Sequence, residues 1–437
     1  MLPPSLMTLL SLLSWFGLAA AGASALSAKP SVSDEIFVGI VNFRDRRCGV
    51  TLFNLFTKST WPAKVHVGVI EYTHTEDDVS DCTKDFCRLM GGQNKCDTYL
   101  KNVKYTIVSF LDARGPNVAR YMQNTLMGDQ EFCLQIDAHS DFIPGWDSDL
   151  LQSWRMLDNE FGVLSTVPPA LDKLLGAAAE AQSASATVNH LCAASFTHNN
   201  VVRNLLPVQR TAQRSEQILS PLWSAGFSFS KCHAFAKTPY DPSLLYLFDG
   251  EEFAMFARLW TRGYDVYTPT HTIVVHDYDN ALFNKLPEKM GAMSSGGKAI
   301  DFNAWSRFGQ SPEWSRQMYD DAHGRVLTML GASTSATGQT GAQELVLLGK
   351  YGLGSKRTLQ QLIDFTGLDT RTWRVVGDRC SAPLQRVKVD HDGGDAWLEE
   401  GDPWGRAGEE RPAGGEEIPL LSGGSFTMYS DKFGNKN

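Results

Sequence analysis

The chain has 437 residues, of which 43% are hydrophobic and 20% charged, so it has enough apolar material for two or more globular domains. Its formal net charge of -9 excludes a general nucleic-acid binder, because such proteins present a basic surface to the phosphates. A single anionic nucleotide is still a feasible ligand if a metal ion and a few local cations face it.

An apolar leader opens the chain. Residues 6–21 are almost wholly apolar, and small-x-small sites follow in Ala21-Gly22-Ala23 and Ala23-Ser24-Ala25. This pattern predicts a signal peptide or signal-anchor at residues 1–25, although no Lys or Arg precedes the apolar run. We therefore expect the secretory pathway, in the Golgi or ER lumen, with membrane association through this segment. The alternative is a cytoplasmic protein with an uncleaved apolar extension.

From Ile36 onward, apolar runs alternate with helical patterns. Ile36–Val41 and Val65–Tyr72 are predicted strands, and Gly49–Ser59 between them has helical spacing, which gives a βαβ unit. Thr73–Asp97 is polar and contains cysteines, and we predict an elaborate loop there.

The alternation continues through five further segments, which are predicted as strand, helix, strand, helix and strand. They are Val103–Phe110, Gly115–Gly128, Phe132–Ile136, Trp146–Asn159 and Phe161–Val167. This order predicts an α/β fold with a Rossmann-like, mostly parallel, doubly wound sheet flanked by helices.

The second half of the chain has a weaker pattern. Leu171–Thr187 is rich in Ala and Ser, which predicts a variable insertion. Ser224–Phe229 and Thr272–Val275 are predicted strands, and a helix is expected from about Glu251 to Arg262. Short amphipathic pieces follow at Glu344–Leu348 and Leu359–Phe365, and residues 384–437 form an acidic, Gly-rich tail that we predict to be largely disordered.

Eight cysteines are present, and three of them crowd into Cys82–Cys96. In a secretory lumen they predict disulfides, but the sequence leaves the connectivity open. Cys133 lies inside an apolar strand, and we predict that it is a buried free thiol.

The Phe132–Ile136 run stops abruptly at Asp137-Ala138-His139-Ser140-Asp141. Ligands of open α/β sheets bind at the carboxyl ends of the strands, and residues two apart on an extended segment point the same way. Asp137 and His139 therefore form a candidate metal site, and their donor set suits a borderline ion such as Mn²⁺. The alternative is a strand followed by a polar turn.

Several blocks resemble the GlcNAc-type glycosyltransferases, which include enzymes that modify hydroxyproline on a ubiquitin-ligase adaptor. The similarity covers Glu35–Tyr278 and Tyr351–Asp369, and it is carried by IFVGIVNFRDRRCGVTLFNLFTKS, RGPNVARYMQNTL, FCLQIDAHSDFIPGWD, SAGFSF, PYDPSLLYLFDGEEFAMFARLWTRGYDVYTP and VVHDY. More distantly, the chain is similar to the mucin-type polypeptide GalNAc-transferases. The resemblance implies a GT-A fold for a catalytic domain at 33–285, with its insertion at 171–190 and a C-terminal extension at 286–383.

The same resemblance implies a divalent metal held by an Asp-x-His pair and a later His. Here these residues are Asp137, His139 and His276, with His271 as the competing third ligand. A divalent cation between the phosphates neutralises the charge that develops on a nucleotide leaving group.

Four further residues are candidates for contacts around the donor. Arg44 is predicted to contact the uracil or a phosphate, or else to pair with Asp45. Arg120 would face the nucleotide or form a solvated helix face, and Trp146 would stack on a sugar or on the core. Asp141 is expected to hold a metal ligand by hydrogen bonding.

Glu251 and Glu252 are the candidate catalytic residues, since the related transferases carry a Gly-Glu pair beside the donor sugar. A carboxylate there can accept hydrogen bonds from sugar hydroxyls and stabilise positive charge on the anomeric carbon. The alternative is that both carboxylates only complement the helix dipole.

Together these inferences predict a metal-dependent enzyme that transfers GlcNAc from UDP-GlcNAc to a polypeptide hydroxyl of Ser, Thr or hydroxyproline. The resemblance implies retention of configuration, and it implies a nucleotide sugar and an acceptor polypeptide or glycan as partners. The apolar leader departs from the cytosolic members and favours a secretory acceptor. Alternatives are a transferase that uses UDP-GalNAc or UDP-Gal, and a non-catalytic protein that binds nucleotide sugars or glycans.

Overall fold

The computed structural model describes residues 34–73, 81–171, 187–211, 218–278, 312–332, 348–381, 383–391, 417–419 and 425–427. The predicted leader, most of the predicted insertion, most of the piece at 344–348 and most of the tail lie outside these residues. Within the described ranges, no helix has both the length and the apolar character needed to cross a membrane.

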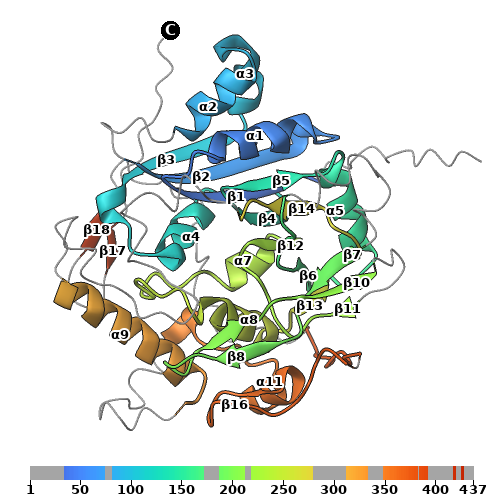
Figure 1. Ribbon diagram of the computed structural model, residues 1–437, viewed down its shortest axis with the longest axis vertical. Helices are drawn as coiled ribbons and strands as arrows, with labels where there is room; N and C mark the ends of the chain where they lie inside the picture. Colours follow the sequence, from blue (N-terminus) through green and yellow to red (C-terminus); the bar gives the residue numbers. More distant parts are fainter. Residues whose placement is uncertain are drawn as a thin grey trace, which may run out of the picture.

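An eight-stranded sheet forms the centre of the molecule, in the order β11-β13-β6-β12-β4-β1-β2-β3 (Figure 1). Its strands are β1 (Ile36–Phe43), β2 (Val65–Thr73), β3 (Val103–Ser109), β4 (Phe132–Asp137), β6 (Gly162–Ser165), β11 (Ile218–Leu219), β12 (Phe227–Lys231) and β13 (Asp265–Thr268). Neighbours from β4 to β3 are parallel, and so are β6 and β13. Antiparallel pairs form only where β12 meets β4 and β6 and where β11 meets β13, so the predicted mostly parallel α/β sheet is confirmed.

The alternation of side chains along β1 explains why helices cover both faces of the sheet. Ile36, Val38 and Ile40 point into one apolar core, whereas Phe37 and Val41 point into the other. A strand that is apolar on both faces needs a helical layer on each side.

Helices α1 (Cys48–Thr57), α2 (Cys82–Leu89), α3 (Gln93–Leu100) and α5 (Trp146–Arg155) contribute to the first core. The second core is formed by α4 (Pro116–Asn124), α7 (His233–Lys237), α8 (Glu251–Thr261), α9 (Pro312–Met329) and α11 (Leu359–Thr366). Figure 1 shows α1 to α3 on one side of the β1–β3 end of the sheet and α4 on the other. Short 3₁₀ turns lie at η1 (Pro62–Lys64), η2 (Phe110–Asp112) and η7 (Gly349–Tyr351).

Five small antiparallel ribbons complete the described structure. They pair β5 (Ser140–Phe142) with β14 (Val274–His276), β7 (Thr187–His190) with β10 (Val208–Thr211), β8 (Ala194–Phe196) with β9 (Val202–Asn204), β15 (Leu368–Asp369) with β16 (Arg374–Val375), and β17 (Glu417–Pro419) with β18 (Ser425–Thr427). The strand predicted at Thr272–Val275 therefore exists as β14, but it pairs with β5 outside the main sheet.

The loop predicted for Thr73–Asp97 is wrong over most of its length, because α2 and α3 form there. Both helices are largely polar, yet they bury Phe86 and three cysteines against α1. The apolar contacts of these short helices are few, so the sequence pattern resembles that of a loop.

All eight cysteines form disulfides, which join Cys48 to Cys82, Cys87 to Cys96, Cys133 to Cys232 and Cys192 to Cys380. The predicted free thiol at Cys133 is therefore wrong. Its partner lies 99 residues away, just after β12, and becomes adjacent only because β12 pairs with β4.

The beginning of the predicted disordered tail is docked on the domain. Arg386 pairs with the buried carboxylate of Asp265, which also receives a 2.6 Å ion pair from Arg357. The ring of His391 stacks on Phe161 with 3.6 Å between the centroids. Within residues 384–391, Arg386 and His391 thus bind the domain beside the start of β13 and next to Phe161.

Candidate functional site

The candidate site lies where the direction of chain progression through the sheet changes. From β1 the chain continues to β2 and β3 on one side, and β4 lies against the other side of β1. Val41 pairs with Asp137, so β1 and β4 end at the same edge. Such a point in an open α/β sheet separates the two loops and leaves a crevice between them.

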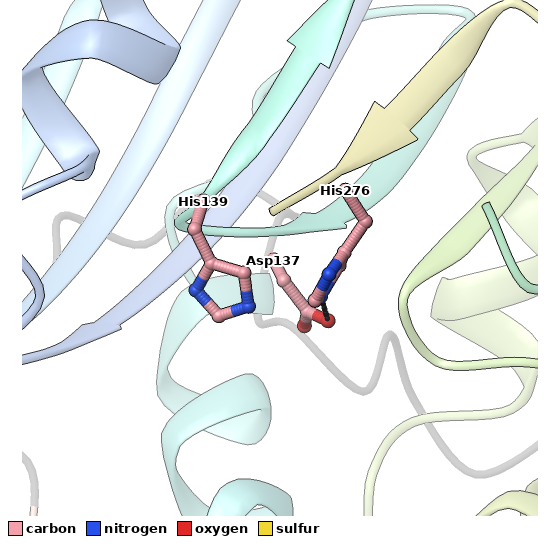
Figure 2. A group of neighbouring side chains, drawn as sticks. All are labelled: Asp137, His139 and His276. Atoms are coloured by element: carbon pink, nitrogen blue, oxygen red, sulfur yellow. Dashed lines mark hydrogen bonds and ion pairs between the residues drawn. The ribbon is translucent and has the colours of Figure 1, made fainter. Parts of the chain in front are cut away.

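Asp137, His139 and His276 converge at this edge, and Figure 2 shows their side chains turned toward one another. One potential ligand atom from each residue lies within 4.8 Å of the others. The two imidazole rings meet edge to face, with 4.2 Å between their centroids, and His276 Nε2 is 3.2 Å from Asp137 Oδ2. The structure therefore brings the predicted triad together.

The β5–β14 ribbon explains how two distant histidines meet. His139 immediately precedes β5, and His276 ends β14 opposite Ser140. The backbone N–H of Asp277 donates to the carbonyl of His139 across 2.9 Å. Both imidazoles are thus carried by one ribbon that crosses the end of β4.

Electrostatic contacts keep Asp137 ionised. Burial alone would raise the pKa of its carboxyl, but the hydrogen bond from His276 and the Arg120 guanidinium 3.1 Å away hold it well below its usual range. The site thus offers an ionised carboxylate and two imidazoles. This donor set fits a borderline divalent cation such as Mn²⁺ and leaves positions for other oxygen ligands.

Arg120 connects the metal triad to the candidate catalytic residues. Its side chain is buried, and it contacts Asp137 Oδ1 at 3.1 Å and Glu251 Oε1 at 3.2 Å. The alternative of a solvated helix face is therefore wrong. Arg120 also lines the cavity described below, where a nucleotide contact stays a prediction.

Glu251 and Glu252 begin α8, directly after Gly250 in a left-handed conformation with φ 92°. Glu252 accepts hydrogen bonds from the backbone N–H of Ala225 and from the Asn204 amide, each at 2.9 Å. Burial, opposed by Arg120 and reinforced by the charge of Glu252, raises the pKa of Glu251 to about 8. Burial raises the pKa of Glu252 as well, so the two adjacent carboxyls differ in their partners: Ala225 and Asn204 hold Glu252, whereas the Arg120 guanidinium contacts Glu251.

A cavity of about 790 Å³ unites these groups. Its wall includes the metal triad, Arg120 and both glutamates, and its volume is in the range of small-molecule sites. Apolar side chains also line the cavity, and among them Leu206 is 91% exposed and Phe248 is 40% exposed.

Two of the predicted donor contacts are corrected by the structure. Trp146 is fully buried, and its indole N–H donates to the Leu55 carbonyl at 2.9 Å, so it is a core residue rather than a sugar contact. Arg44 is also buried, with its guanidinium 4.6 Å above the Phe110 ring, and it does not contribute to the described lining of the cavity.

The predictions for two neighbours of the triad are wrong as well. The competing ligand His271 bonds through Nε2 to Asp149 on α5, at 2.9 Å, and is not part of the triad. Asp141 pairs with Lys58 at 2.6 Å instead of holding a metal ligand.

One residue that contacts the triad was not predicted from the sequence. Asp45 Oδ2 lies 2.7 Å from His139 Nδ1, and the Asp45 side chain is 6% exposed. The available signal was its position in the loop after β1, next to the end of β4, but the sequence suggested only a local pairing with Arg44.

The fold and the triad define an α/β protein with a candidate divalent-cation site inside a cavity at the carboxyl edge of its sheet. A family model described as Glycosyltransferase (GlcNAc) matches residues 35–90 and 84–372. Because the match covers well over half of its length, the chain belongs to this glycosyltransferase family, as the sequence blocks predicted.

Comparisons with solved structures give weaker likenesses. GalNAc-T7 in a complex with UDP, GalNAc and Mn²⁺ is similar over 76% of this chain and 56% of that chain, with 12% identity and a TM-score of 0.44. The mannosyltransferase PcManGT from Pyrobaculum calidifontis, in a complex with GDP-Man and Mn²⁺, is similar over 78% and 82%, with 13% identity and a TM-score of 0.36. The chain thus spans little more than half of the GalNAc-T7 chain. No curated protein sequence matches it.

Proposed function

We propose that this protein is a metal-dependent glycosyltransferase that moves N-acetylglucosamine from UDP-GlcNAc to a hydroxyl of a polypeptide. The observation that carries the proposal is the Asp137–His139–His276 triad in one cavity with Glu251 and Glu252. Membership of the glycosyltransferase family supports the reaction class, and the donor sugar and the Ser, Thr or hydroxyproline acceptor follow from the resemblance in sequence.

In this proposal Asp137, His139 and His276 hold the divalent cation. When bound, the cation supplies positive charge to the diphosphate of the donor. Arg120 lies behind Asp137 and keeps its carboxylate ionised and oriented. In a chain of net charge -9, these local cationic groups offset the repulsion that a nucleotide diphosphate would otherwise meet.

The two glutamates are proposed to act on the sugar and the acceptor. Glu252 is held by Ala225 and Asn204, so each of its two oxygens already accepts a hydrogen bond from the fold. Glu251, with its raised pKa, can donate a hydrogen bond while it is protonated and accept one once it is ionised. By resemblance we propose retention of configuration, either through a front-face reaction, which needs no enzymic nucleophile, or through a double displacement that uses a carboxylate.

We further propose that the protein acts in the secretory lumen rather than in the cytosol. Four disulfides take up all eight cysteines, and such bonds persist in oxidising compartments. A secretory acceptor is therefore favoured over the cytosolic acceptor of the hydroxyproline-modifying members.

Incubation of the purified protein with individual UDP-sugars, Mn²⁺ and peptides that contain Ser, Thr or hydroxyproline tests the proposal. We expect UDP release that is fastest with UDP-GlcNAc and is abolished by EDTA. Faster turnover of UDP-GalNAc or UDP-Gal would correct the donor. Folded protein that binds UDP with Mn²⁺ yet neither hydrolyses nor transfers any sugar would support a non-catalytic binding protein instead.

A further inference from the structure

We infer that Asp45 is a positioning residue for the metal site: its carboxylate fixes the His139 imidazole so that Nε2 faces the cation. This inference deepens the proposed function and rests on its metal site. The two residues are 94 positions apart, and they meet because β1 and β4 are neighbours that end at the same edge.

The tautomer of His139 follows from the chemistry of the contact. An ionised carboxylate can only accept hydrogen bonds, so the 2.7 Å contact with Asp45 Oδ2 requires a proton on His139 Nδ1. Neutral imidazole then keeps its lone pair on Nε2, the remaining nitrogen that can bind a metal. Carboxylates that hold a ligating histidine in this way strengthen metal binding.

The carboxylate of Asp45 is itself held in place. Its Oδ1 accepts from the backbone N–H of Arg47 at 2.8 Å, and its own N–H donates to Asn42 Oδ1 at 3.0 Å. Because the oxygens already bond Arg47 and His139, Asp45 is not needed as a fourth ligand. Asp45 lines the same cavity, but it is not among the three residues that could hold the cation.

The support for Asp45 extends to a buried carboxylate and a disulfide. The Asn42 amide donates to Glu71 at 3.0 Å, and the second oxygen of Glu71 accepts from the N–H of Cys82 at 3.1 Å. Cys82 is bonded to Cys48, which follows the loop. The loop at residues 44–47 is therefore fixed at both ends, at β1 and at the Cys48–Cys82 disulfide.

The same loop also contacts the second histidine's segment. Arg47 Nε lies 3.3 Å from Asp277 Oδ2, and Asp277 directly follows His276. The loop thus bonds to the His139 ring through Asp45 and to the strand end that carries His276 through Arg47. The loop at residues 44–47 thus helps to hold both imidazoles in position.

Titration with Mn²⁺ alone, followed by the EPR signal of the free ion, tests the inference in protein freed of metal. Asp45→Asn should weaken Mn²⁺ binding about 10–100-fold, the usual effect of removing such a partner. Asp141→Asn is the matched control, because it removes the same charge two residues from His139 without touching a ligand ring. We expect its affinity to stay within about threefold of wild type.

A role in positioning also predicts that saturating Mn²⁺ restores the turnover of Asp45→Asn toward the wild-type value. If Asp45→Asn binds Mn²⁺ as tightly as Asp141→Asn, the inference is overturned while the proposed function stands. If the wild-type protein binds no Mn²⁺, both fall. If it binds Mn²⁺ with the expected Asp45 dependence but transfers no sugar, only the proposed function falls.

A second measurement reads the tautomer of His139 in the wild-type protein itself. In ¹⁵N-histidine NMR spectra of the metal-free wild type at about pH 8, where an ordinary imidazole is neutral, His139 should carry its proton on Nδ1. The spectrum of His139→Gln identifies the resonance. A proton on Nε2 would overturn the inference whatever the variants show.

Discussion

Asp137 and Glu251 both contact the guanidinium of Arg120, and the pKa values of their carboxyls nevertheless move in opposite directions. Arg120 contacts both carboxyls; Glu251 is buried, whereas the Asp137 side chain is 30% exposed. Asp137 also faces two imidazoles, and the pKa of its carboxyl falls well below the usual range. Glu251 faces the like charge of Glu252, so burial prevails and its pKa rises to about 8.

The difference shows that contact with the same arginine does not give two carboxyls the same protonation state. The outcome depends on the remaining neighbours, which come from different elements: the β5–β14 ribbon beside Asp137 and the start of α8 beside Glu251. Environments that separate the pKa values of nearby titratable groups mark the division of chemical roles in active sites. Four substitutions test this comparison.

The largest effect is expected from Asp137→Ala. It removes the ionised carboxylate, which is also one of the proposed metal ligands. Loss of a residue that only hydrogen-bonds to a metal ligand weakens metal binding by up to about 100-fold. Mn²⁺-dependent UDP binding should therefore weaken by more than this in Asp137→Ala. Calorimetric titration with UDP and Mn²⁺ measures it. Asp97→Ala on the exposed face of α3 is the control, and unchanged binding in Asp137→Ala would refute the metal assignment.

Arg120→Met removes the guanidinium that contacts both carboxyls. Loss of one partner from a buried ion pair destabilises a protein by about 3–5 kcal/mol, and we expect the lower end because Glu251 already accepts a proton readily. Urea unfolding measures the change in the free energy of unfolding. Arg88→Met, which breaks an exposed pair with Asp85 on α2, should cost less than about 1 kcal/mol. Equal effects would show that the Arg120 contacts are no stronger than surface pairs.

Glu251→Gln tests the raised pKa of the second carboxyl. The unfolded Glu251 carboxyl loses its proton near its ordinary pKa of 4.5, whereas the folded one keeps its proton up to about pH 8. The folded state therefore holds more protons in this window, and the free energy of unfolding should fall as the pH rises from 4.5 to 8. Denaturant unfolding of metal-free protein should show this fall in the wild type and a flatter profile in Glu251→Gln. Parallel profiles would mean that the pKa of Glu251 is ordinary.

The smallest effect is expected from Gly226→Ala. A Cβ atom at this position would lie 3.1 Å from Asp137 Oδ2, so the carboxylate must shift by a few tenths of an ångström. Mn²⁺ affinity should fall about fivefold, which corresponds to about 1 kcal/mol. Gly324→Ala on α9 meets no atom within 4 Å and should leave Mn²⁺ binding unchanged while slightly stabilising the helix. A Gly226→Ala protein with wild-type Mn²⁺ affinity would show that the site tolerates a small shift of the Asp137 carboxylate.

The sequence predicted the half of the sheet that forms the site better than the surrounding layers. The apolar runs of β1, β2 and β4 are buried on both faces, so their pattern is strong and local. α2 and α3 were missed because they are polar helices whose burial is concentrated in Phe86 and the cysteines. Their stability comes from disulfides and packing, which local periodicity does not report.

The sequence predicted those site residues that local spacing or the resemblance to a family identifies. Asp137 and His139 follow directly from the end of a strand, and His276 was added by resemblance. Asp45 was missed, because its link to His139 depends on the β1–β4 pairing. Trp146 was predicted to stack on a sugar or on the core, and its contacts with Leu55 on α1 and Phe142 on β5 hold it in the core.

The disulfides also give the molecule a covalent topology. Cys192 and Cys380 are 188 residues apart, so their bond closes a ring that includes α8 and both glutamates. The ring closed by Cys133 and Cys232 overlaps it. A single proteolytic cut anywhere between Cys133 and Cys380 therefore releases no fragment, and the nicked chain should migrate as one species until a reductant is added. The wall with the metal triad and the wall with the glutamates thus stay covalently joined even when the backbone between them is broken.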